Sequence, residues 1–124
     1  MRSAADLAGA AAAELAARTS IEHHDLALVL GSGWRETVDG LGEIVAQTPV
    51  ADLTGFSSPT VEGHGADALS IAVAGHQVLA FTGRSHYYES RDAQQVVHAV
   101  RTAAAAGCKA VVLTSACYQF TVTE

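Results

Sequence analysis

Residues 78–89 read Val78-Leu79-Ala80-Phe81-Thr82-Gly83-Arg84-Ser85-His86-Tyr87-Tyr88-Glu89. The first five form an apolar run typical of a buried strand. The rest bring a guanidinium, imidazole, phenol and carboxylate groups close together directly after it. Open α/β sheets bind small ligands at the carboxyl ends of their strands, so the stretch predicts a ligand site at a sheet edge. Arg84 offers a planar set of donors suited to phosphate or carboxylate.

Two further apolar runs extend this strand into an α/β sheet. Residues 26–30 predict a strand that ends at Gly31-Ser32-Gly33, a loop able to approach an oxyanion closely. Residues 109–114 predict a third buried strand, preceded by a helix that begins after Asp92 and ends at Gly107 in the left-handed conformation. A strand, a crossover helix and a strand imply parallel pairing. The fold class is therefore α/β, with a mixed, largely parallel sheet and flanking helices.

The remaining elements are predicted from periodicity and turn residues. The alanine-rich segment 1–17 favours a surface helix, and 34–38 a short helix. Residues 44–53 suggest a strand split at proline, and 69–73 alternate as a strand with one buried face. Gly75-His76 predicts a type II′ hairpin link. Three groups of residues carry further expectations: Leu7, Ala11 and Leu15 on one face of the first helix; Val96, Val97, Val100 and Ala104 as the apolar stripe of the later helix, opposite Gln94, His98 and Arg101; and His23-His24-Asp25 as a solvated turn.

Composition excludes several classes of function. The 124 residues are 49% hydrophobic and 16% charged, which indicates one packed domain rather than a disordered chain. The formal net charge of −6 argues against nucleic acid or anionic lipid as a partner. No segment predicts a membrane span, and Cys108 and Cys117 suggest a reduced, cytoplasmic compartment without disulfides.

Several motifs, taken in order, resemble a known family. They are Leu28-Val29-Leu30-Gly31-Ser32-Gly33, Thr60-Val61-Glu62-Gly63-His64, Gly83 to Glu89, and Val112-Leu113-Thr114-Ser115-Ala116. Across nearly the whole chain, their order and spacing are similar to the N-terminal half of the trimeric, low-molecular-mass class of purine nucleoside phosphorylase. Gly-Ser-Gly alone is weak evidence, whereas Gly-Arg-x-His-x-Tyr-Glu after a strand is more specific.

The resemblance implies a partial three-layer phosphorylase sandwich that performs phosphorolysis without a cofactor. Inorganic phosphate, the co-substrate, would cleave a purine (deoxy)ribonucleoside to the free base and (deoxy)ribose 1-phosphate, in purine salvage. The family's homotrimer would be the expected assembly. By motif position, the implied phosphate-binding residues are Ser32, Arg84, His86, the backbone N–H of Ala116 and His64, the last also near the ribose; the ribose-binding residues are Tyr88 and Ser115; the catalytic residues are His86 and Glu89, with Glu89 holding a histidine or the proton of the phosphate.

The sequence departs from the family pattern at three places. Glu62 stands where the family usually has proline, and Ser115 where it has asparagine. Tyr118-Gln119 replaces a glycine pair, and the second half that supplies purine-binding residues does not follow. The expectation is a single, incomplete domain over residues 1–124 with an aberrant tail at 118–124. A frameshift, a truncation and a genuine short protein all remain open, and so does the purine preference.

Other hypotheses compete with phosphorolysis. A methylthioadenosine phosphorylase shares the Gly-Ser-Gly and Arg-x-His elements. A non-catalytic remnant of the family, either an anion-binding or an oligomer-interface fragment, would explain the departures. Dinucleotide binding is disfavoured because Glu36 stands where a third glycine is needed. Taken singly, each histidine is more often a packing or surface residue. Cys117 is predicted to be an inert small residue, with no cation beside it in sequence.

Overall fold

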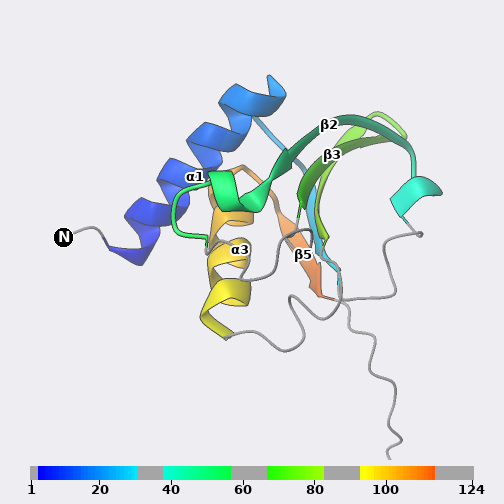
Figure 1. Ribbon diagram of the computed structural model, residues 1–124. Helices are drawn as coiled ribbons and strands as arrows, with labels where there is room; N and C mark the ends of the chain where they lie inside the picture. The colour runs from blue at the N-terminus through cyan, green and yellow to red at the C-terminus, as the bar shows by residue number, and fades with distance from the viewer. Residues whose placement is uncertain (1–2, 31–37, 57–66, 83–92, 114–124) are drawn as a thin grey trace, which may run out of the picture.

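The computed structural model describes residues 3–30, 38–56, 67–82 and 93–113 (Figure 1). Five strands form one sheet in the order β2-β3-β4-β1-β5. Their bounds are β1 Leu26–Val29, β2 Glu43–Pro49, β3 Asp67–Val73, β4 His76–Thr82 and β5 Ala110–Leu113. The helices are α1 Ala4–Thr19, the short 3-10 helix η1 Val50–Asp52 and α3 Ala93–Ala105. None of the helices in these ranges is long and apolar enough to cross a bilayer.

The sheet is mixed, as predicted, and β1 lies at the centre of its parallel part. Strand β1 pairs in parallel with β4 on one side and β5 on the other. Strands β2, β3 and β4 pair antiparallel in sequence order. The unit β4-α3-β5 therefore crosses over β1, which confirms the predicted strand–helix–strand connection and adds a strand between its two ends.

The helices α1 and α3 pack against each other on one side of the sheet (Figure 1). The larger core cluster lies between them and the sheet, and it includes Leu15, Leu79 and Phe81, none more than 1% exposed. The opposite face buries Leu69 and Ile71, and in the described part of the chain the cluster there includes Val38 and Leu41. The α/β class is thus confirmed, and the described residues comprise one layer of helices packed on one face of the sheet.

Helix α1 has the sequence signals of a well-terminated helix. Ser3 and Asp6 form a reciprocal capping box, and Ser20 ends the helix with a φ of 63°. Ala11 and Leu15 are buried as predicted, while Leu7 is half-buried. The predicted helix is confirmed with its end two residues later, at Thr19.

The apolar stripe predicted for α3 is confirmed only in part: Val96 packs partly buried against the core, whereas two other members of the stripe are exposed. Val97 is 42% exposed and Ala104 is exposed. The buried residues of the helix and its end are instead His98, Ala99, Thr102, Ala103 and Ala106. Small side chains face the core because α3 packs against both α1 and the sheet, and a close interhelical approach leaves little room for valine. The predicted helix end at Gly107 is confirmed by its φ of 101°.

Two predictions about the antiparallel strands need correction. The hairpin loop is Ala74-Gly75, with φ values of 50° and 85°, so it is a type I′ turn placed one residue earlier than predicted. This turn matches the right-handed twist of the strands it joins. The strand predicted over 44–53 is split at Pro49 as expected, but the part after the proline is the 3-10 helix η1 rather than a second piece of strand.

Burial along the strands also differs from expectation. Residues 68–71 of β3 are all buried, so both faces of this strand are covered rather than one. Strand β5 was predicted to be buried, yet Val112 and Leu113 are 45% and 58% exposed. The cause is position: β5 is the edge strand of the sheet, with β1 as its one neighbour among the described strands.

The turn predicted at His23-His24-Asp25 is only partly solvated. His24 is 1% exposed, and its Nε2 atom lies 2.7 Å from Ser70 Oγ on β3. Asp25 accepts a hydrogen bond of 2.9 Å from the backbone N–H of Gln77 at the start of β4. The segment before β1 is therefore bound to the sheet through one buried and one partly exposed side chain.

Candidate functional site at the carboxyl ends of the parallel strands

Three neighbouring parallel strands end at one edge of the sheet. Val29 of β1 is in register with Phe81 of β4 on one side and with Leu113 of β5 on the other. The pairing of β1 with β4 continues for one more residue, since the N–H of Leu30 donates to the carbonyl of Phe81 at 2.9 Å. Adjacent strands lie about 4.8 Å apart, so the three strand ends lie side by side.

The predicted phosphate residues follow these strand ends at equal distances along the chain. Ser32, Arg84 and Ala116 each come three residues after the registered positions Val29, Phe81 and Leu113. The strand ends are observed features of the structure. The side chains that follow them lie outside the described residues, so their convergence stays a prediction.

The segment that carries His64 returns to the sheet at the same edge. Strand β3 runs antiparallel to β4, and its first residue, Asp67, pairs with Thr82, the last residue of β4. His64 precedes Asp67 by three residues, and Arg84 follows Thr82 by two. The Thr82 hydroxyl also donates to the carbonyl of Asp67 at 3.5 Å. Four chain segments with predicted ligand-binding residues therefore start or end at this edge.

All predicted site residues belong to ranges that the structure does not describe. They are Ser32, His64, Arg84, His86, Tyr88, Glu89, Ser115 and Ala116. The predicted aberrant tail, 118–124, also lies outside the described residues. The structure thus places the strand ends from which they extend, and it leaves the individual roles of the side chains as predictions. Among the residues that it describes, no group of three or more metal-ligating side chains is present.

The described groups whose pKa is shifted lie at the opposite edge of the sheet, where β1, β4 and β5 begin. Burial lowers the pKa of His24, and the backbone N–H of Gln77 lowers the pKa of Asp25. Burial raises the pKa of Cys108 to about 11, with a smaller contribution from Asp25. A thiol with that pKa stays protonated at neutral pH and is a poor nucleophile. These groups are therefore structural rather than part of the predicted phosphate site.

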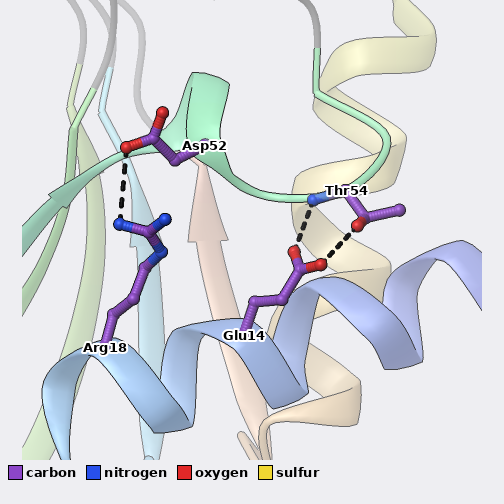
Figure 2. A network of polar contacts seen from close by, with 4 residues as sticks. All are labelled: Glu14, Arg18, Asp52 and Thr54. Carbon is purple, nitrogen blue, oxygen red and sulfur yellow. Dashed lines mark hydrogen bonds and ion pairs between the residues drawn. The ribbon is translucent and has the colours of Figure 1, made fainter.

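A polar contact that the sequence did not predict lies beside the site edge. Thr54 follows η1, and both its amide and its hydroxyl donate to the Glu14 carboxylate of α1 (Figure 2). The Thr54 carbonyl accepts from His98 Nε2 of α3 at 2.8 Å. Glu14 lies 40 residues before Thr54 in sequence and His98 lies 44 residues after it, so no local sequence pattern connects the three. His98 was predicted from helical periodicity to lie on the polar side of α3, and it is instead buried.

Comparison with known proteins agrees with this geometry. No family model matches the chain. Curated relatives do: a purine nucleoside phosphorylase of Mycobacterium leprae is 48% identical over 111 residues, which cover 90% of this chain and 41% of the relative. A purine nucleoside phosphorylase of Cellulomonas sp. is 44% identical over 116 residues, with the same coverage of each chain.

A solved structure shares the fold as well. A purine nucleoside phosphorylase in complex with ribose 1-phosphate superposes with a TM-score of 0.70 and 25% identity, over 88% of this chain and 39% of that one. The fold and the strand-end motifs thus define a nucleoside phosphorylase architecture. The chain belongs to the purine nucleoside phosphorylase family, in the low-molecular-mass class that its motifs resemble. It spans 41% of the length of the curated relatives it matches.

Proposed function

We propose that this chain carries the phosphate site of a purine nucleoside phosphorylase. The observation that supports it best is the common register of Phe81, Val29 and Leu113 on β4, β1 and β5. Three residues after these positions come Arg84, Ser32 and Ala116, respectively. A guanidinium, a hydroxyl and a backbone N–H extending from adjacent strand ends suit a tetrahedral oxyanion. Because the whole chain has a formal charge of −6, the positive charge for phosphate has to be local, and Arg84 supplies it.

The proposed reaction is phosphate-dependent cleavage of a purine nucleoside. Phosphate bound at the strand ends would attack the anomeric carbon of the ribose, the bond to the purine nitrogen would break, and ribose 1-phosphate would form. The purine leaves with the bonding electron pair, while the ribose passes through an oxocarbenium-like state that the phosphate anion stabilises. The related phosphorylase crystallised with ribose 1-phosphate supports this product.

Each remaining residue has a proposed role in that reaction. His86 and His64 would complete the phosphate cradle, with His64 also near the sugar. Tyr88 and Ser115 would contact the ribose, and Glu89 would orient the phosphate through a histidine or through the phosphate's own proton. We further propose that three copies assemble, as the class does, which sedimentation equilibrium measures directly.

The test is release of hypoxanthine from inosine by the purified chain, after circular dichroism has shown that it is folded. We expect release that requires phosphate and that Arg84→Ala abolishes. Release independent of phosphate would contradict phosphorolysis. No release from a folded sample that still binds phosphate would favour the second candidate, an anion-binding family member without catalysis; Ser115 in place of the family's usual asparagine is the observation behind that candidate.

A further inference from the structure

Thr54 is held at all of its polar atoms by two helices. Its amide donates to Glu14 Oε1 at 2.7 Å and its hydroxyl donates to Glu14 Oε2 at 2.5 Å (Figure 2). Its carbonyl lies 2.8 Å from His98 Nε2. A carbonyl oxygen can only accept, so His98 carries a proton on Nε2. Hydrogen bonds to a carboxylate are stronger than neutral ones, and two of the three are of that kind.

The two residues after Thr54 fit closely against the same imidazole. Gly55 has a φ of 90°, and a Cβ atom built there would overlap the His98 ring. The Phe56 ring packs against His98 with centroids 4.5 Å apart and against Phe81 of β4 with centroids 6.0 Å apart. We call Glu14, Thr54, Phe56 and His98 the Thr54 clamp. It joins α1, α3 and β4 through one short segment.

The Thr54 clamp sits where the predicted ligand-bearing segments meet the described framework. Phe56 is the last described residue before 57–66, the range that contains His64. Phe81 precedes Thr82, after which the chain continues to Arg84 and His86. Residues 83–92, which include Arg84 and His86, are followed in sequence by α3, the helix to which His98 belongs. The clamp therefore fixes three points of the framework from which two of the four segments extend.

We propose that Glu14 and His98 are positioning residues for phosphate binding, acting through Thr54 and Phe56. This inference rests on the proposed function. Neither side chain needs to touch phosphate: both hold the framework that determines where the segments with His64 and Arg84 begin. Loss of either contact lowers the fraction of molecules that are competent to bind phosphate. A fall of that fraction to about one tenth raises the apparent Kd about tenfold.

The experiment measures the Kd for inorganic phosphate by isothermal titration calorimetry, at a temperature where every variant is folded by circular dichroism. His98→Leu removes the donor and keeps the bulk, whereas His98→Gln keeps a donor for the Thr54 carbonyl. Glu14→Ala is a second, independent removal. Arg18→Ala is the matched control, because Arg18 lies one turn along α1 and contacts Asp52 at 3.4 Å without reaching Thr54 (Figure 2).

We expect His98→Leu and Glu14→Ala to raise the Kd about tenfold, and His98→Gln and Arg18→Ala to stay within about twofold of the unaltered chain. Rescue by glutamine separates positioning from a general loss of stability. If Arg84→Ala abolishes binding while His98→Leu and Glu14→Ala match Arg18→Ala, this inference is overturned and the proposed function stands. If the unaltered chain binds no phosphate, both are overturned.

Discussion

At the scale of single residues, Gly55 has two constraints that exclude a side chain. Its φ of 90° is a conformation that other residues rarely adopt, and the His98 imidazole occupies the space of a Cβ atom. Gly9 in α1 is the contrasting case, because a Cβ atom there would meet nothing within 4 Å. Replacing each glycine by alanine should therefore change the free energy of unfolding in opposite directions.

Gly55→Ala should lower the free energy of unfolding by about 1 to 3 kcal/mol, through backbone strain and overlap with His98. Gly9→Ala, the control, should raise it by up to about 1 kcal/mol because alanine favours a helix interior. Urea unfolding followed by circular dichroism measures both. Equal effects of the two substitutions would show that the Thr54 clamp does not confine Gly55.

His24 makes a prediction about pH. Burial holds its pKa below the ordinary 6.5, and His23 beside it lowers the pKa further while Asp25 raises it. The unfolded chain therefore binds this proton more readily than the folded chain. The stability that comes from the neutral imidazole is present above about pH 6.5 and is lost as pH falls below that value toward the lower folded pKa.

His24→Gln should make the loss shallower, since it removes the titrating group and keeps a donor for Ser70. Urea unfolding of both proteins from about pH 7.5 to about pH 5 covers the relevant range. Curves that fall in parallel would contradict a role for His24. This pH range lies above the ordinary pKa of a carboxyl group such as Asp25. A difference in unfolding free energy between the two proteins within this range therefore comes from the imidazole.

The sequence could not have distinguished His24 from its neighbours. His23 and His24 are adjacent, but one is largely exposed while the other is buried against Ser70, 46 residues away. Burial of one of two adjacent polar residues depends on which tertiary partner lies opposite, and no local pattern encodes it. The Glu14, Thr54 and His98 contacts were missed for the same reason.

At the scale of elements, burial falls from the centre of the sheet to the edge at β5. Val78 of β4 is 5% exposed, whereas Val112 of β5 is 45% exposed. Strand β4 lies between β1 and β3, while β5 has β1 on one side. The same substitution at these two valines therefore isolates the effect of position in the sheet.

Val78→Ala should cost about 2 kcal/mol, from lost burial and the cavity left behind. Val112→Ala should cost less than about 1 kcal/mol, because nearly half of the side chain is already in water. Thermal and urea unfolding give both values. A cost at Val112 equal to that at Val78 would mean that another surface covers β5 in solution.

The strands and the buried face of α1 were predictable from sequence, whereas the buried face of α3 was not. Apolar runs bounded by turn residues identified β1, β4 and β5, and alternating apolar residues identified β3, because both signals are local to the strand. The valines of α3 suggested a stripe that the structure buries only in part, because small residues such as Ala99 and Ala103 face the neighbouring elements. That preference for small residues is a tertiary effect.

At the scale of the whole molecule, the sheet brings four distant parts of the chain to one edge. The motifs in sequence predicted which segments meet, and the register of β4, β1 and β5 supports it by giving their ends a common level. The predicted site residues themselves are not among the described residues. Sequence resemblance therefore supplies their proposed chemistry, and the topology supplies their proposed proximity.

Arg84 is proposed to bind phosphate at this edge of the sheet. The most direct measurement is a calorimetric phosphate titration of the unaltered chain, Arg84→Ala and Arg101→Ala, the last an equal change of charge at an exposed position of α3. We predict saturable binding that Arg84→Ala abolishes and Arg101→Ala preserves. Equal phosphate affinity in the unaltered chain and Arg84→Ala would contradict the account.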